Sequence, residues 1–504
     1  MARVITDYLE HTACVFPDKT AFVDAKKSIT FSELRNNSLH VAAGIIKTGL
    51  FKQPIGIFLD KGIECIVSFL GTAYSGNFYT MIDTNMPIPR IEKIYTTLQP
   101  RIIITDYAHL SEVKEFAVKS QVIIYEELLE EELNENDVLC VTSRVTDCDV
   151  LYVLFTSGST GIPKGVITSH RAVISYMEAA TDAYNLDNNT IIGNQAPLYF
   201  VLSIIDVFST IKNGGTTHFI PKEYFSFPGQ LVRYVAENRV TLLNWVSSAL
   251  CLVANLKAFK KADMSCVKVV IFGGEIMPVK QLNAWIDALP DTIFVNAYGS
   301  TEVTDGATYY IINRRFKETD LLPLGVPFNN TDILLLSDDD SEVGDNEIGE
   351  LCCRGNNLAY GYYNDPERTE SVFTVNPLNK AYKERIYRTG DLVRYNQYGE
   401  IEYIGRKDFQ IKHMGQRIEL GEIEVNASSI SGVDENCCMY DSENQRIIMF
   451  YTGSIGPEQV SDNMKKLVPV YMVPNKVYRL DEMPHNLNGK IDRAELKRRA
   501  NESI

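Results

Sequence analysis

Residues 156–164 form a loop rich in hydroxyls and glycine, and these residue types could bind an oligophosphate. The loop follows the apolar run 150–155 and includes Thr156, Ser157, Gly158, Ser159, Thr160, Gly161 and Lys164. Glycines let backbone N–H groups converge on an anion, hydroxyls add donors, and lysine supplies positive charge. The spacing is not that of the Walker loop, because Ile-Pro separates Gly161 from Lys164. Composition alone would equally fit a flexible connector.

Two later motifs carry further polar groups that suit a nucleotide. In the run 296–302, Asn-Ala-Tyr-Gly-Ser-Thr-Glu, Tyr298 could stack on a base and Glu302 could hold a magnesium ion that bridges phosphates. In the run 387–392, Asp391 follows a glycine turn, where its carboxylate can accept hydrogen bonds from ribose hydroxyls. Each motif alone also fits an ordinary turn with a satisfied cap. Their occurrence together favours a nucleotide site.

The bulk composition describes an ordinary multidomain chain. Its 504 residues are too many for a single hydrophobic core. The net charge of −16 argues against nucleic acid or an anionic membrane as the main partner. We find no apolar stretch of roughly 18 residues and no signal-peptide core, so we expect a cytoplasmic protein. The ten cysteines show no CxxC or Cys/His spacing, and we expect reduced, mostly buried thiols.

The order of apolar segments predicts an α/β protein with several parts. Strand and helix patterns alternate over 54–150 and again over 166–310, which predicts two α/β subdomains with parallel strands. Near the start we expect a helix over 5–14 and a second helix capped by Ser32. Short apolar segments broken by Asp, Gly and Asn over 320–405 predict a small antiparallel, barrel-like piece. The remainder predicts a compact α+β domain.

Taken in order, these motifs resemble the ANL superfamily of adenylate-forming enzymes over essentially the whole chain. Within it, the chain is most similar to adenylation domains of nonribosomal peptide synthetases and to stand-alone D-alanine carrier-protein ligases. Besides the loop, the resemblance rests on the segments 194–197, 349–351, 361–362, 405–412, 415–424 and 488–493. It implies an AMP-binding core over 1–405 and a small mobile C-terminal domain over 406–504.

The resemblance implies an acid–thiol ligase with two half-reactions. A carboxylate first attacks the α-phosphate of Mg-ATP, giving an acyl adenylate and pyrophosphate, and a thiol then displaces AMP to form a thioester. Lys490 would bridge the carboxylate and the α-phosphate, where charge builds in the transition state. Thr301 and Glu302 would organise phosphate and Mg2+, with Lys164 and the loop on the β- and γ-phosphates. The implied nucleotide contacts also include Gly274, Glu275, Asn296, Tyr298, Gly299, Asp391 and Arg406.

The resemblance also implies a domain rotation between the two half-reactions. The hinge matches Asp408, and rotation would withdraw Lys490 and bring in the loop around Gly415. Because the chain ends shortly after Lys490, we expect the thiol on a separate carrier protein with a phosphopantetheine arm, or on coenzyme A.

One position departs from the amino-acid-adenylating relatives. Those relatives carry a Phe-Asp pair whose aspartate binds the substrate α-ammonium, whereas this chain has Phe200 and Val201. Valine cannot pair with a buried ammonium, which is costly to leave unpaired. The implied pocket positions are Phe200, Val201, Leu202, Ile205, Asn244, Ile271, Gly273, Ala297, Asp305 and Gly306.

This lining favours an aryl acid or another acid without an α-amine, with Asn244 or Asp305 bonding a hydroxyl. A β-amino acid such as β-alanine, whose amine would reach Asp305, is the alternative. Asp206 could supply the carboxylate instead, although helical spacing predicts that it points away. An acyl-CoA synthetase is a second alternative. A catalytically inactive nucleotide-binding scaffold is disfavoured, because Lys490, Glu302 and Asp391 are all present.

Overall fold

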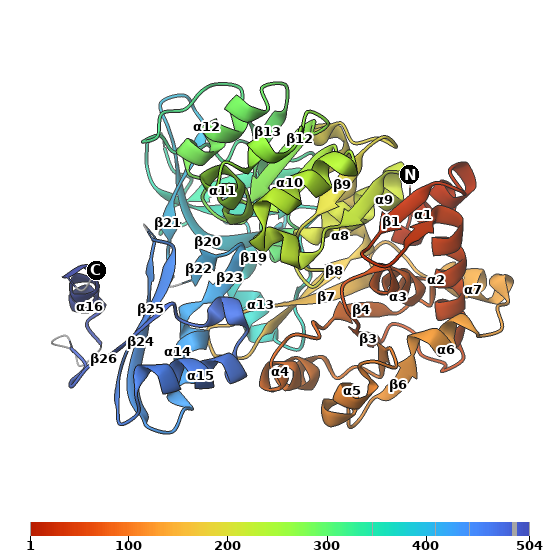
Figure 1. The fold of residues 1–504 in the computed structure, drawn as a ribbon, viewed down its shortest axis with the longest axis horizontal. Coiled ribbons are helices and arrows are strands. Elements are labelled where there is room, and N and C mark those ends of the chain that lie inside the picture. Colours follow the sequence, from red (N-terminus) through yellow and green to blue (C-terminus); the bar gives the residue numbers. More distant parts are fainter. Residues whose placement is uncertain (1, 345, 409, 443, 486–490, 503–504) are drawn as a thin grey trace. The chain divides into compact units, whose positions relative to one another are not determined.

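The computed structural model describes residues 2–502 except 345, 409, 443 and 486–490. The chain divides into two compact units (Figure 1). The first unit contains Met1–Thr84, Leu98–Leu154 and Gly165–Lys407, and the second contains Asn85–Thr97, Phe155–Lys164 and Asp408–Ile504. The 156–164 loop therefore belongs to the unit that also contains the C-terminal segment.

A seven-stranded sheet forms the first α/β part. Its order is β18-β8-β7-β4-β3-β5-β6. Pairing is parallel between β3 and β4, between β3 and β5 and between β5 and β6, and all five residues of β3 are buried, as expected where helices cover both faces. The strands are β3 (Pro54–Phe58), β4 (Phe78–Met81), β5 (Ile102–Thr105), β6 (Gln121–Ile124), β7 (Val150–Thr156), β8 (Lys164–Ser169) and β18 (Gly361–Tyr362).

Five helices accompany this part of the chain. They are α2 (Phe31–Ile46), α3 (Ile63–Tyr74), α5 (Leu110–Phe116), α6 (Tyr125–Leu129) and α7 (Glu135–Thr142). The expected cap of α2 was wrong by two residues. The Thr30 side chain accepts from the Glu33 N–H at 3.2 Å, and the Glu33 carboxylate accepts from the Thr30 N–H at 2.9 Å. This reciprocal capping box starts the helix at Phe31, before Ser32.

A nine-stranded sheet forms the second α/β part, in the order β15-β14-β13-β12-β11-β9-β10-β1-β2. Its six central strands, from β13 to β1, are parallel. The strands are β1 (Thr20–Val23), β2 (Ser28–Thr30), β9 (Ile191–Asn194), β10 (Thr216–Phe219), β11 (Leu242–Val246), β12 (Val269–Gly273), β13 (Ile293–Tyr298), β14 (Thr308–Ile311) and β15 (Val326–Pro327). The predicted two α/β parts are confirmed, except that the N-terminal β1 and β2 join this later sheet.

Helices pack on both faces of the nine-stranded sheet and make two separate cores. One core joins Ile271 and Val295 with α1 (Ile5–Val15), α8 (His170–Tyr184) and α9 (Ser203–Asn213). The other joins Leu243, Trp245 and Phe272 with α10 (Pro228–Glu237), α11 (Ser247–Asn255) and α12 (Val279–Ala288). Successive residues of β11 thus alternate between the cores.

The region 320–405 is antiparallel, as predicted. It forms a five-stranded sheet of β16 (Thr331–Leu336), β17 (Gly349–Gly355), β19 (Phe373–Val375), β20 (Arg385–Tyr395) and β21 (Ile401–Arg406), with α13 (Pro366–Val372) beside it.

The C-terminal segment of the second unit is α+β, also as predicted. It contains β22 (Gln410–His413), β23 (Gln416–Glu419), α14 (Leu420–Ser428), β24 (Val433–Asp441), β25 (Arg446–Gly453), α15 (Pro457–Leu467), β26 (Lys476–Arg479) and α16 (Arg493–Glu502). All but the last residue of α4 (Ile88–Leu98) also lies in this unit.

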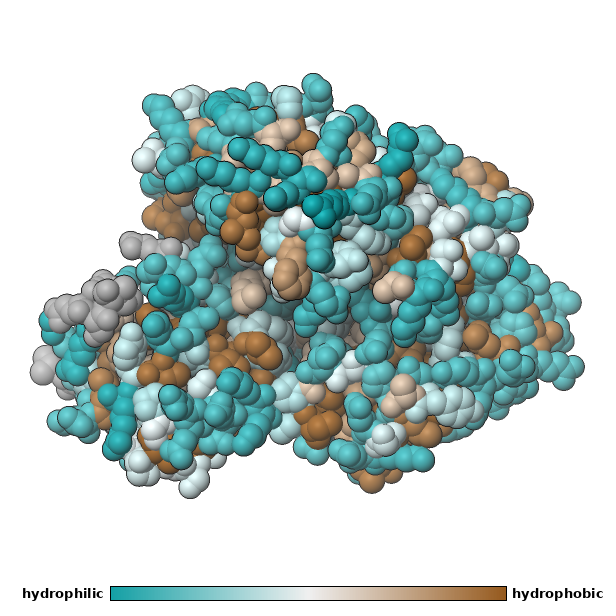
Figure 2. All heavy atoms as spheres, in the orientation of Figure 1, coloured by the Kyte–Doolittle hydropathy of each residue, from teal (hydrophilic) through white to brown (hydrophobic). Residues whose placement is uncertain are grey.

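The surface agrees with the composition. Hydrophilic residues predominate on the face drawn in Figure 2, and apolar residues lie among them in small groups. Within the described residues, no helix combines the length and apolar character needed to cross a membrane. All ten cysteines are free, and the pairs Cys352–Cys353 and Cys437–Cys438 are buried in strands β17 and β24.

Candidate active site

Asp391 lies at the centre of a buried polar cluster in the first unit. It sits on β20 directly opposite Arg406 on β21, so the two side chains share one face of the antiparallel pair. The Arg406 guanidinium forms an ion pair with the Asp391 carboxylate and donates to the Thr389 carbonyl at 3.1 Å. Asp391 is only 4% exposed. The register therefore supplies the cation that a buried carboxylate needs.

Tyr298 completes the cluster from the end of β13. Its hydroxyl donates to the second carboxylate oxygen of Asp391. The Tyr298 ring packs in the apolar cluster that contains Val303 and Leu351. Burial, followed by the charge of Asp391, raises the pKa of Tyr298 well above its usual value, so the hydroxyl stays a donor. Each carboxylate oxygen keeps a second lone pair and can accept a further hydrogen bond.

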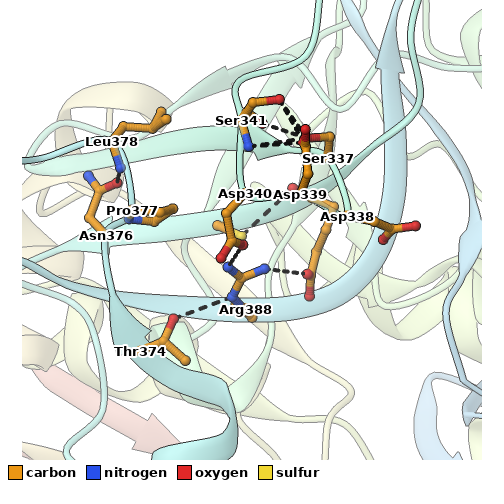
Figure 3. Close-up of polar contacts among 12 residues, drawn as sticks. Ser337, Asp338, Asp339, Asp340, Ser341, Thr374, Asn376, Pro377, Leu378 and Arg388 are labelled. Atoms are coloured by element: carbon orange, nitrogen blue, oxygen red, sulfur yellow. Dashed lines mark hydrogen bonds and ion pairs between the residues drawn. The ribbon is translucent and has the colours of Figure 1, made fainter.

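Glu350 of β17 fixes the backbone next to Asp391. One of its carboxylate oxygens accepts from the Gly390 N–H at 3.0 Å, and the other accepts from Arg388 at 3.1 Å. Figure 3 shows Arg388 also reaching Asp340 in the 337–341 turn and Thr374 on the neighbouring β19. The turn is itself held by hydrogen bonds among its serines and Asp339. These contacts tie β17, β19 and the 337–341 turn to the strand that carries Asp391.

The segment after β13 makes a tight turn that presents Glu302. A Cβ on Gly299 would lie 1.8 Å from the Asp305 carbonyl oxygen, so only glycine fits there. Thr301 and Glu302 are 4% and 0% exposed, and the Tyr362 hydroxyl donates to Glu302 at 2.7 Å. The buried Ser300 hydroxyl has no hydrogen-bond partner among the residues that the structure describes. An oxygen-rich ligand would suit this turn.

The predicted pocket positions on the nine-stranded sheet lie in two adjacent rows on one face. Asn244 is in register with Ile271, and Gly273 is in register with Ala297. Because alternate residues of a strand share a face, all four point to the side covered by α8 and α9. Gly273 and Ala297 lie at or next to the carboxyl ends of their strands, where α/β proteins commonly bind ligands. A Cβ on Gly273 would meet the Ala297 carbonyl oxygen at 2.4 Å, which explains the glycine.

Asp206 on α9 does not point away from the sheet, and this expectation was wrong. Its carboxylate accepts from the Asn194 amide at 2.6 Å and from the Asn244 amide at 3.0 Å. Burial is the main cause that raises the pKa of Asp206 to about 7, although the two amides and the charge of Lys61 lower it. Asn244, expected to bond a substrate hydroxyl, donates instead to Asp206 and to the Leu202 carbonyl.

The remaining pocket positions surround the start of α9 and the turn after β13. Val201, Leu202 and Ile205 are buried, and Phe200 packs beside Leu202. Asp305 is partly exposed, and its charge helps to raise the pKa of Tyr176, after burial. A Cβ on Gly306 would lie 2.3 Å from the Tyr176 ring. The backbone and side chains here are closely packed around small residues.

In the second unit, carboxylates and carbonyls of the C-terminal segment occupy the donors of the 156–164 loop. The Ser157 hydroxyl donates to the Arg417 carbonyl at 2.6 Å, and the Gly158 N–H donates to Glu422 at 3.2 Å. Lys164 lies 3.9 Å from Glu419. Gly161 has a φ of 77°, which favours glycine, and the buried Thr156 hydroxyl has no partner within the described part of the chain. The loop thus already binds carboxylate oxygens, and its donors suit an anion.

The other predicted residues are placed as follows. Asn296 donates to the Pro323 carbonyl at 2.8 Å, and Glu275 accepts from the Ser248 N–H at 2.7 Å. Gly274 has a φ of 77° just after β12. Asp408 is the first residue of the last segment of the second unit and accepts from the Gln410 N–H at 3.1 Å. Lys490 lies outside the described residues.

Sequence reasoning left several contacts unassigned. Tyr362 and Glu350 stood in motifs that were quoted only for resemblance, and the pattern gave no sign that they hold Glu302 and Gly390. The buried ion pair between Arg90 of α4 and Glu422 of α14 joins positions far apart in the sequence. Helix α4 also carries Glu92 and Lys93, so no sequence pattern indicated that Arg90 is the buried charge.

Comparison with known proteins places the chain among nucleotide-dependent enzymes. The profile of the family described as "AMP-binding enzyme" matches residues 9–363. Surfactin synthase subunit 1 of Bacillus subtilis (strain 168) is 29% identical over 98% of this chain, which spans only 14% of that relative. Zwittermicin A synthase ZmaJ of Bacillus cereus is 29% identical over 98% of this chain and 94% of its own length.

The fold is also found in solved structures. The structure of holo-PA1221, described as a nonribosomal peptide synthetase protein with adenylation and carrier domains, has a TM-score of 0.84 at 22% identity, covering 99% of this chain and 84% of that one. This likeness confirms the predicted fold.

Proposed function

Since the chain belongs to the AMP-binding enzyme family, we propose that it activates a carboxylic acid with ATP and transfers the acyl group to a thiol. In the first step a carboxylate oxygen attacks the α-phosphorus, and the bond to the β-phosphate breaks, releasing pyrophosphate. In the second step the thiol sulfur attacks the acyl carbon, AMP leaves and the thiol proton passes to solvent. The match of residues 9–363 to this family confirms the family prediction made from the motifs.

The cluster around Asp391 is the observation that supports this proposal most strongly. A carboxylate held by Arg406 and Tyr298, with lone pairs to spare, suits two neighbouring hydroxyls such as those of ribose. The ion pair and the Tyr298 hydrogen bond orient the Asp391 carboxylate before any ligand arrives. Binding then costs little reorganisation.

We assign the triphosphate to the hydroxyls and backbone of the 156–164 loop, with Lys164 as its cation. The buried hydroxyl of Thr156 would gain an acceptor from a phosphate oxygen. Mg2+ prefers oxygen ligands, and Glu302 with Thr301 would hold it. The ion would supply positive charge to the phosphates. ATP must also displace the carboxylates of Glu419 and Glu422 that now face the loop.

We assign the remaining roles from the resemblance. Lys490 would neutralise the carboxylate and α-phosphate as they approach, and Asp408 would be the hinge that exchanges the two half-reactions. A carrier protein with a phosphopantetheine arm would provide the thiol, and coenzyme A is the alternative acceptor. Both present the same thiol chemistry.

An ATP–pyrophosphate exchange screen tests the proposal. The full chain is incubated with ATP, Mg2+ and panels of amino, β-amino, aryl and short aliphatic acids, and Asp391→Asn serves as the impaired variant. At least one acid is expected to support exchange, and Asp391→Asn is expected to raise the KM for ATP. Failure of every acid in a protein that binds ATP would overturn the proposal.

A further inference from the structure

Three buried side chains of the first unit form a cluster of acceptors. Asp206, Asn194 and Asn244 are 0%, 0% and 1% exposed. Both asparagine amides donate to Asp206, at 2.6 Å and 3.0 Å, one to each carboxylate oxygen. The Oδ1 atom of Asn194 is buried and has no hydrogen-bond partner within the described chain. Since it belongs to the amide that donates to Asp206, this acceptor lies beside the carboxylate.

The cluster can therefore accept more hydrogen bonds than its two amide groups donate. Each Asp206 oxygen has one hydrogen bond and can take another, and Asn194 Oδ1 has none. A buried acceptor without a donor is unfavourable, because it has lost its water without replacement. A ligand with N–H groups would satisfy both sites at once.

The charges nearby also favour a cation. The Lys61 ammonium lowers the pKa of Asp206, and the Asp305 carboxylate raises it. Lys61 already donates to the Gln195 carbonyl at 3.3 Å and lies 5.7 Å from the Phe219 ring centre. With Asp206 ionised, the Lys61 ammonium stabilises its charge and the Asp305 carboxylate opposes it. One further positive charge would balance the group.

The cluster adjoins the predicted acid pocket. Asn194 and Asn244 are in register across β9 and β11, and Asn244 is in register with Ile271 of the pocket face. Asp206 approaches the same face from α9, one position after the pocket residue Ile205. A group bound at Asp206 would thus belong to the substrate that lies along these strands.

We infer that Asp206 and Asn194 bind a protonated amine of the acid substrate, so that the enzyme selects an ammonium-bearing acid. The inference rests on the proposed function. It replaces the earlier preference for an amine-free acid, because the carboxylate missing at Val201 is supplied by Asp206. Asp206 is then a specificity-determining residue.

Matched acid pairs in the ATP–pyrophosphate exchange assay test the inference. β-Alanine is compared with propionate, and phenylalanine and β-phenylalanine are compared with phenylpropionate. We expect the ammonium member of at least one aliphatic pair to have a kcat/KM roughly 10⁴-fold higher, as for a site built to bond a group that the analogue lacks. Equal rates for the two members of every pair, or faster exchange with the member that lacks the amine, would overturn the inference and leave the proposed function standing. Exchange with no acid would overturn both.

Asp206→Asn separates a binding role from a structural one. The variant is expected to lower kcat/KM for the ammonium member far more than for its partner without the amine, so that the preference disappears. Asp182→Asn, which removes the same charge at an exposed position on α8, is expected to keep the wild-type preference. An equal fall for both members of a pair in Asp206→Asn would refute the assigned contact. If that variant does not fold, the wild-type pair preference alone decides.

Discussion

Replacing Asp206 by asparagine should change how the stability of the first unit depends on pH. The pKa of Asp206 is raised from 3.8 to about 7 by burial, so the folded protein binds a proton that the unfolded chain releases at lower pH. The stability that this proton provides is therefore complete below about pH 4 and is lost as pH rises toward 7. Asparagine has no such proton to lose.

The structure sets the size of the effect. One pKa unit corresponds to about 1.4 kcal/mol. Between pH 5 and pH 7 the wild-type protein should lose about 2 kcal/mol of unfolding free energy through this group, since Asp206 is half ionised at the upper limit. Lys61, whose pKa is lowered to about 8 by burial, titrates mainly above this interval. The Asn194 amide can rotate to offer its unpartnered oxygen to the new side chain.

Urea unfolding followed by tryptophan fluorescence measures this difference. The chain has two tryptophans, Trp245 and Trp285, and both are fully buried in the first unit. Unfolding free energies of wild type, Asp206→Asn and the Asp182→Asn control are compared at pH 5 and pH 7. We expect a smaller loss only in Asp206→Asn. An equal loss in all three proteins would refute the assigned environment of Asp206.

Three further predictions concern the nucleotide site. Lys490→Ala should abolish adenylate formation but leave thioester formation from supplied acyl adenylate largely intact; equal loss in both assays would contradict its role. Tyr298→Phe removes a donor to buried Asp391 and should cost about 1.5–3 kcal/mol of unfolding free energy with a raised KM for ATP, and an unchanged protein would contradict the contact. Arg90→Ala leaves Glu422 buried without this partner and should cost about 3–5 kcal/mol, seen as faster amide exchange in the second unit; unchanged exchange would contradict the buried pair.

Local patterns predicted the features that depend on neighbouring residues. The glycine and hydroxyl spacing located the loop, and the glycine turns located Glu302 and Asp391, because a sharp turn requires particular residue types. The alternating strand and helix patterns predicted parallel sheets, because each pattern is a periodicity among neighbouring residues. The resemblance implied that Asp391 and Arg406 both contact the nucleotide, and the β20–β21 register places the two residues directly opposite each other.

Non-local pairing was not predictable. Strand β1 pairs with β10 through Phe22 and Thr217, and neither segment has a sequence pattern that indicates which strand it pairs with. Asp206 was misjudged for a different reason. All residues from Ser203 to Ile211 are buried, so α9 has no polar face to fix its orientation. Only the sheet, through Asn194 and Asn244, shows where the carboxylate points.

The fate of the acid's carboxylate oxygen tests the central claim most directly. An acid that supports exchange is prepared with heavy oxygen in its carboxyl group and turned over with ATP and a thiol acceptor, and AMP is analysed by mass spectrometry. Attack of the carboxylate on the α-phosphate should leave one labelled oxygen in AMP. Unlabelled AMP, or ADP as the product, would contradict the account.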